Sequence, residues 1–199
     1  MAWDWGKAQP DEAGGWRVTN DLGYAIHITD GALMDAALQL VPCSDSAGLF
    51  APQAAYAGHG GGKPDETRWS GPLRESLGKP ITVDLGTVEL DDHRYCQAHY
   101  LLAPSEVTGP TFVLMGTYLA PNSKTPVAFA LNTSTAWGGI TDFPKDSVID
   151  GNTQQAPLRM TLMRNLGALL DGVDFEAMTP DQQARVVLRS LTSNIQILQ

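Results

Sequence analysis

The stretch Tyr24-Ala25-Ile26-His27-Ile28-Thr29 decides the fold, because its apolar and polar side chains alternate with the period of a half-buried β-strand. Tyr24, Ile26 and Ile28 share one face, and His27 lies on the opposite face. The segment therefore predicts a sheet with one face in the core and His27 pointing away from it.

Further strand-like segments follow along the chain, each bounded by Gly, Pro, Asn or Asp. Asp30-Gly31 is a turn dipeptide. The run from Ala32 to Val41 also fits helical spacing, but we interpret it as a strand that enters Pro42-Cys43. Sequential strands with short turns favour a mainly β chain, an antiparallel β-sandwich of the Ig-like kind with long loops. The other expected strands cover residues 81–85, 95–102, 111–119, 127–131 and 158–163.

The two ends of the chain differ from this pattern. Thr179-Pro180-Asp181-Gln182 supplies an N-cap, a first-turn Pro and a capping-box Gln, and predicts a C-terminal helix at about residues 180–192. Residues 1–15 are polar and Gly-rich with two Trp, which favours a flexible N-terminal arm or an edge segment. Residues 16–199 are then expected to form a single β-sandwich domain with the helix.

Composition excludes some classes of partner. The formal net charge is -9, and no cluster of Lys and Arg could neutralise a phosphate backbone, so nucleic acid is not an expected partner. No apolar stretch is long enough to span a bilayer as a helix. The first residues lack the basic and apolar regions of a signal peptide, so an exported protein is expected here with its signal peptide removed.

Cys43 and Cys96 are the two cysteines, and no Cys-x-x-Cys spacing is present. We predict a disulfide between them; the alternative is a pair of buried free thiols in a cytosolic protein. Closing a loop of about fifty residues would stabilise the fold by roughly 4 kcal/mol in the chain-entropy model. The bridge would also enclose the long loop-like region from residue 44 to residue 79.

Histidines are the candidate metal ligands. Strand alternation places His99 on the face opposite Cys96, as it places His27 opposite its apolar neighbours, and His59 lies in a Gly-rich loop. His27, His59 and His99 are the predicted metal site, because three imidazoles with an open position suit copper or zinc. The alternative is that each is an ordinary surface or hydrogen-bonded side chain. His93, beside Asp91-Asp92, has the pattern of a turn residue.

Catalytic motifs are absent from the sequence. No Gly-x-Ser-x-Gly, His-Glu-x-x-His or Walker loop occurs, and Gly58-His59-Gly60-Gly61-Gly62 resembles an esterase oxyanion loop without its serine motif. We therefore predict a binding protein and not an enzyme.

Three stretches together resemble a family of exported bacterial proteins related to MbnP and the methanotroph surface copper proteins. The stretches are Val18–Tyr24 running on to Leu40-Val41-Pro42-Cys43, Tyr95–Tyr100, and Leu170-Asp171-Gly172-Val173-Asp174-Phe175. The last of them is similar to the aromatic signature that precedes the terminal helix of that family.

The resemblance implies a β-sandwich in the periplasm or at the cell surface that binds copper through histidines. In some members a tryptophan oxidised to kynurenine by a partner dihaem enzyme is a further ligand. His27, His59 and His99 are the positions that match the histidine part, and Trp69 and Trp137 are candidates for the modified residue. The Trp-x-His spacing of some relatives is missing here, which argues against a kynurenine ligand.

The leading hypothesis is an extracytoplasmic copper-binding protein that stores, delivers or sequesters the ion. A second is an Ig-like interaction module that binds another exported protein and no metal. A third is a metal-dependent extracytoplasmic enzyme with a general base such as Asp30 or Asp92.

Overall fold

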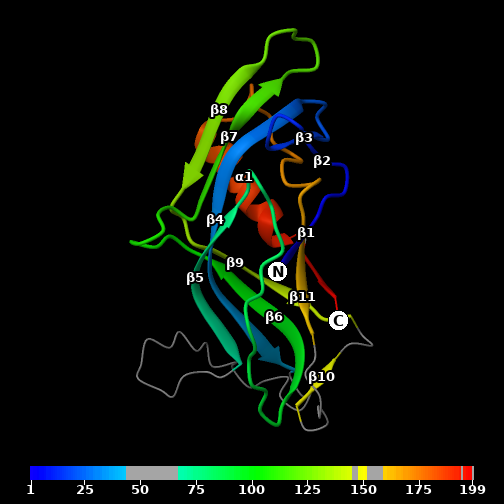
Figure 1. Cartoon of the computed structure of the whole chain (residues 1–199), viewed down its shortest axis with the longest axis vertical. Helices are drawn as coiled ribbons and strands as arrows, with labels where there is room; N and C mark the ends of the chain where they lie inside the picture. The colour runs from blue at the N-terminus through cyan, green and yellow to red at the C-terminus, as the bar shows by residue number, and fades with distance from the viewer. Residues whose placement is uncertain (44–66, 145–147, 152–158, 194, 199) are drawn as a thin grey trace.

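The computed structural model describes residues 1–43, 67–144, 148–151, 159–193 and 195–198 (Figure 1). The mainly β fold predicted from the sequence is confirmed, since strands in two sheets pack as a sandwich and a single helix follows near the C-terminus. The elements are β1 (Ala2–Asp4), β2 (Gln9–Pro10), β3 (Trp16–Thr19), β4 (Ala25–Pro42), β5 (Arg68–Ser76), β6 (Arg94–Leu102), β7 (Phe112–Leu119), β8 (Val127–Thr133), β9 (Trp137–Asp142), β10 (Ile149–Asp150), β11 (Thr161–Asn165), α1 (Pro180–Ser193) and β12 (Ile195–Leu198).

Strand β4 organises the large sheet, and Figure 1 shows it running along most of the molecule. Its first part pairs with β3 on one side and β7 on the other. Its second part pairs with β5 and β6. β8 extends the sheet beyond β7, while β9 and β10 extend it beyond β6. All of these pairings are antiparallel.

The turn predicted at Asp30-Gly31 is wrong, because β4 continues through it. A register shift between Ile28 and Asp30 opposite β7 accommodates the dipeptide as an irregularity within the strand. A Cβ atom at Gly31 would lie 2.7 Å from the carbonyl oxygen of Val113, so only glycine lets β7 approach this closely.

The small sheet has the order β1-β11-β12, and β1 pairs with β11 in parallel. This corrects the expectation of a flexible arm over residues 1–15, since β1 is an edge strand of this sheet and Trp3 is buried. The edge alternative was therefore the better interpretation. The strand predicted at residues 81–85 is also wrong, although Val83 and Met1 exchange two backbone hydrogen bonds there.

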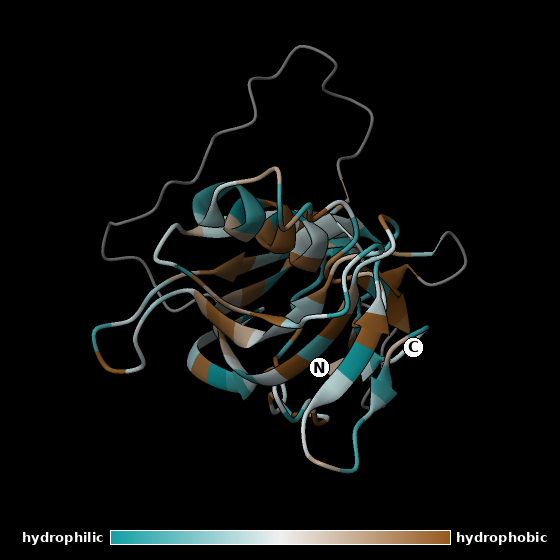
Figure 2. Ribbon diagram, turned by 90° about the horizontal axis from the view of Figure 1, so that it is seen from above, coloured by the Kyte–Doolittle hydropathy of each residue, from teal (hydrophilic) through white to brown (hydrophobic). Residues whose placement is uncertain are grey.

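The helix expected at residues 180–192 is confirmed as α1, and its N-terminus has the predicted capping box. The Thr179 amide donates to Gln182 Oε1 at 2.9 Å, and the Gln182 amide donates to Thr179 Oγ1 at 3.4 Å. Helix α1 packs against β8 and β9 with its apolar face, and Figure 2 shows it lying across the strands. No helix among the described residues is both long and apolar enough to cross a membrane.

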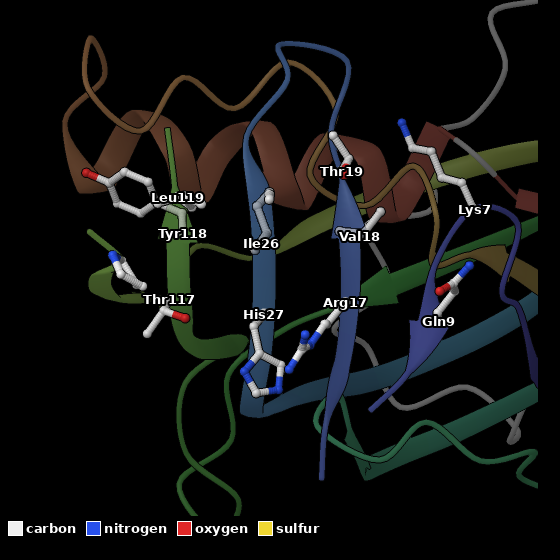
Figure 3. A pocket seen from close by; sticks show the side chains of 12 residues that line it. Lys7, Gln9, Arg17, Val18, Thr19, Ile26, His27, Thr117, Tyr118 and Leu119 are labelled. Carbon is white, nitrogen blue, oxygen red and sulfur yellow. The ribbon is translucent and has the colours of Figure 1, made fainter. Parts of the chain in front are cut away.

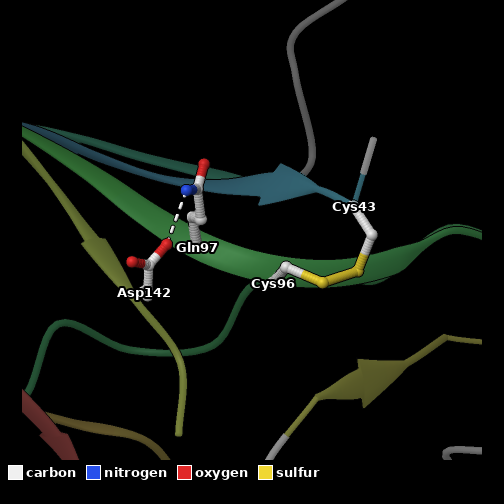
Figure 4. Close-up of a disulfide and its surroundings, with 4 residues drawn as sticks. All are labelled: Cys43, Cys96, Gln97 and Asp142. Atoms are coloured by element: carbon white, nitrogen blue, oxygen red, sulfur yellow. Dashed lines mark hydrogen bonds between the residues drawn. A yellow bond between two sulfur atoms is a disulfide. The ribbon is translucent and has the colours of Figure 1, made fainter. Parts of the chain in front are cut away.

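The predicted disulfide is confirmed. Cys43 and Cys96 are bonded, with their Cα atoms 4.9 Å apart, and the bridge ties the end of β4 to β6 (Figure 4). Hydrogen bonds flank it, because the Cys43 amide donates to the Arg94 carbonyl and the Phe143 amide donates to the Cys96 carbonyl, each at 2.7 Å. Next to Cys96 on β6, Gln97 donates from Nε2 to Asp142 Oδ1 of the neighbouring strand β9 at 2.6 Å.

Candidate functional site

His27 points away from the core, as its place in the alternation predicts. Ile26 and Ile28 are buried on the inner face, while His27 lies on the wall of an open groove of about 560 Å³ (Figure 3). Its Nε2 lies 3.1 Å from the Gly14 carbonyl oxygen and 3.2 Å from Asp11 Oδ2. Both neighbours accept hydrogen bonds, so Nε2 carries the proton. His27 thus has the hydrogen-bonded surface role that was the alternative to ligation.

His99 lies on β6 between Gln39 of β4 and Ile140 of β9. Its partner Gln39 is twelve positions along β4 from His27 (39 − 27), which corresponds to roughly 40 Å of extended strand. Ligands of one ion lie within a few ångströms of each other. The structure therefore does not bring His27 and His99 to one ion, and this corrects the predicted ligand set. His59 lies outside the described residues.

The two tryptophans considered for oxidation lie on different strands. Trp69 of β5 pairs with Leu38 of β4 and is half-buried, whereas Trp137 begins β9 opposite Leu102 and is 37% exposed. Trp69 pairs with the second half of β4, and Trp137 pairs with Leu102 of β6, whereas His27 lies in the first half of β4. A kynurenine at either residue stays a prediction.

The turn before β6 gathers Asp91, Asp92 and His93, which the sequence pattern marked only as a turn. One ligand atom from each lies within 4.8 Å of the other two, and all three side chains are exposed. Asp91 Oδ1 accepts bonds from the His93 amide at 3.1 Å and from His93 Nδ1 at 2.6 Å, and the Tyr95 hydroxyl also donates to it. One imidazole and two carboxylates therefore have ligand atoms close enough together to hold a metal ion.

Electrostatics in this turn favour the charged forms. The hydrogen bond from Tyr95, then those from His93, lower the pKa of Asp91 below its ordinary value of 3.8. The hydrogen bond to Asp91 and the charge of that carboxylate raise the pKa of His93 above 6.5. A metal ion at the turn would therefore compete with a proton on His93.

Gly151 fixes the position of the turn against β10. Its amide donates to the His93 carbonyl at 2.9 Å, and a Cβ atom there would lie 1.7 Å from the Asp91 carbonyl oxygen. Any side chain would push the two segments apart. The turn is thus held between the disulfide on β6 and the end of β10.

A second cluster of charges lies in the core. Arg164 of β11 donates to Asp35 of β4 and to Glu75 of β5, and Trp3 donates from Nε1 to Glu75 at 3.1 Å. The guanidinium lies over the rings of Trp3 and Tyr100, with centroid distances of 5.4 and 5.5 Å. Because these groups come from both sheets, the cluster joins the two layers of the sandwich.

The cluster holds two carboxylates against one guanidinium. Burial raises the pKa of Asp35 to about 8, an effect that Arg164 opposes and the neighbouring Glu75 strengthens. For Glu75 burial also opposes ionisation, but the Arg164 charge and its hydrogen bonds hold the pKa below 4.5. Asp35 Oδ1 accepts from Arg164, whereas Asp35 Oδ2 is buried and has no hydrogen-bond partner among the described residues. Since the three side chains are at most 2% exposed, no substrate reaches them, and we assign the cluster to stability.

Sequence reasoning missed the charge cluster, although one signal was present. Asp35 interrupts the apolar run from Ala32 to Leu40, and a charge in such a run calls for a buried partner. Nothing local in the sequence indicates that Arg164 supplies it, 129 residues away.

The chain matches no protein-family model, no curated protein and no solved structure.

Proposed function

We propose that this protein is an extracytoplasmic metal-binding protein with copper as its ion, and that Asp91, Asp92 and His93 form the part of the site that lies within the described residues. The observation that carries the proposal is the convergence of their ligand atoms within 4.8 Å next to the Cys43–Cys96 bridge. Imidazole and carboxylate ligands together suit Cu(II). Storage, delivery or sequestration of the ion is the function that we infer.

The disulfide supports the proposed location, the periplasm or the cell surface, because disulfides persist in oxidising compartments. The resemblance described above points to the same compartment and to copper. Maturation by a dihaem enzyme at Trp69 or Trp137 is part of that proposal, and intact mass tests it, since conversion of tryptophan to kynurenine changes the mass of the chain.

The pKa directions at the turn give the proposal a pH dependence. His93 must lose its ring proton before it can ligate, and its raised pKa makes that proton harder to remove. We expect copper affinity to rise with pH through and above the ordinary titration range of histidine. His93→Ala should remove most of this dependence.

The test measures copper retained by protein purified without a His tag, together with titration calorimetry against CuSO₄ and ZnSO₄. His93→Ala and Asp91→Asn should each weaken Cu(II) binding at least tenfold, which is about 1.4 kcal/mol. His27→Ala and His99→Ala are matched controls that remove an imidazole elsewhere and should bind as the unaltered protein does. His59→Ala tests the one histidine outside the described residues.

Full copper binding by His93→Ala and Asp91→Asn would refute the site. Absence of binding by the unaltered protein would refute the metal function and favour the second candidate, a protein-interaction module. A specific observation favours that module too: within the described residues, β8 pairs only with β7 and forms an edge of the large sheet.

A further inference from the structure

Within the described residues, strand β8 forms an edge of the large sheet, and helix α1 packs against this strand. Among the residues that the structure describes, it pairs with β7 alone. Its seven residues, Val-Ala-Phe-Ala-Leu-Asn-Thr, include no charge, no Pro and no Gly, and its pairing with β7 has no bulge. Natural sheets commonly block an exposed edge with such features. Alternate residues of β8 direct their N–H and C=O groups away from β7, and among the described residues no other strand pairs with these groups.

A groove of about 300 Å³ lies beside this edge, and most of the residues that line it have apolar side chains, although polar atoms also face the groove. Its floor is aromatic, because the ring of Phe175 stacks on Tyr118 at 4.5 Å and contacts Phe129 at 4.9 Å. Val127, at one end, is 46% exposed. A strand edge that pairs with no other strand in the described part of the chain, beside a groove lined mostly by apolar side chains, is an arrangement that binds an added β-strand. The main apolar lining residues are Tyr118, Val127, Phe129, Leu131, Phe175 and Met178.

Charge decides between the possible occupants. Glu176 follows Phe175 of the groove, Asp181 follows Pro180 of the groove, and both side chains are exposed. The whole chain carries a formal net charge of -9. A second copy would bring the same carboxylates and the same negative charge to the edge, which repulsion disfavours. A basic partner gains attraction at the same places.

We propose that β8 is a docking edge for an extended, basic segment of another protein. The segment adds as a further strand beside β8, places alternate apolar side chains in the groove, and presents Lys or Arg to Glu176 and Asp181. Seven residues of strand offer roughly 23 Å of edge. This interaction is independent of the proposed metal site, because none of the ligand residues at positions 91–93 lines the groove.

Three synthetic peptides of equal length test the proposal by fluorescence anisotropy with the full chain. The first alternates Lys and Val, the second alternates Glu and Val, and the third repeats the Lys-Val sequence with alternate amides N-methylated on one edge. Binding of the first should be at least tenfold tighter than binding of the second, because of the acidic rim. It should also be at least tenfold tighter than binding of the third, because N-methyl groups remove the donors that a new strand needs.

Protein variants locate the contact. Glu176→Lys combined with Asp181→Lys should weaken binding of the Lys-Val peptide at least tenfold, since both side chains are exposed. Glu12→Lys combined with Glu89→Lys is the matched control, because both side chains are exposed, neither residue lines the groove, and the formal charge changes by the same amount. Hydrogen exchange should show new protection of alternate amides within residues 127–133 when the peptide is present.

Equal binding of the methylated peptide would overturn the added-strand geometry and leave only charge attraction. Protection elsewhere, or no binding of the Lys-Val peptide, would overturn the docking edge. Protection of residues 127–133 that increases with protein concentration alone would replace the basic partner by a second copy of this chain.

Discussion

Replacing Asp35 by Asn removes the carboxyl group whose pKa is raised in the buried charge cluster, and so measures how much its proton contributes to stability. Asn preserves the size of the side chain and an oxygen that can accept from Arg164, but it cannot ionise. In the folded protein the pKa of Asp35 is raised to about 8, while in the unfolded chain it returns to the ordinary value of 3.8. Between these values the folded state holds one proton more than the unfolded state.

This difference in bound protons determines whether the free energy of unfolding rises or falls with pH. Because the folded state binds the extra proton, the free energy of unfolding contributed by Asp35 is fully present below pH 3.8 and is lost as the pH rises toward 8. One proton corresponds to about 1.4 kcal/mol per pH unit. From pH 5 to pH 7.5 the unaltered protein should therefore lose about 3 kcal/mol that Asp35→Asn does not lose.

Urea denaturation at half-unit pH steps, followed by tryptophan fluorescence, measures both slopes. Glu106→Gln, which removes an exposed carboxyl group, should follow the unaltered protein and serves as the control. Parallel curves for Asp35→Asn and the unaltered protein, or a carboxyl carbon resonance of Asp35 that titrates near pH 4, would contradict a raised pKa of Asp35.

Further predictions concern other stabilising features. Arg164→Met leaves two buried carboxyl groups unpaired and should lower the free energy of unfolding by roughly 3–5 kcal/mol. The loss should be larger at pH 8 than at pH 5. Arg185→Met, at an exposed position, should change the free energy of unfolding little. Removing the disulfide by Cys43→Ser with Cys96→Ser should lower the free energy of unfolding by about 4 kcal/mol in urea denaturation. It should also weaken copper binding at the adjacent turn. Unchanged copper affinity would show that the bridge does not support the metal site. Thr179→Ala removes the N-cap of α1 and should lower the unfolding free energy by about 1 kcal/mol, and a loss under 0.3 kcal/mol would contradict the capping role.

The sequence predicted those strands and the helix whose residue patterns, such as alternation or a capping box, lie within the element itself. The alternation around His27, the capping box at Thr179 and the strand at residues 95–102 all lie where the sequence placed them. By contrast, β9 contains Gly138-Gly139 and alternates poorly, so its pairing with β6 depends on tertiary contacts that no local pattern shows.

The candidate site was less predictable for the same reason. Alternation correctly placed His27 and His99 on faces away from the core, but their separation depends on which part of β4 pairs with β6. The cluster at His93 was visible as a run of possible ligands, yet its compactness comes from hydrogen bonds to Asp91 that the sequence pattern indicated only as a turn.

The length of β4 determines how the protein opens. This strand pairs with β3, β5, β6 and β7. If β4 leaves the large sheet, its hydrogen bonds to all four of these strands must therefore break. Leu40 pairs with Ala98 and Ile28 with Gly116, so these ladders also join distant parts of the chain. Amide protons along β4 should therefore exchange with solvent mainly through global unfolding, and the molecule should lose its structure in one cooperative step.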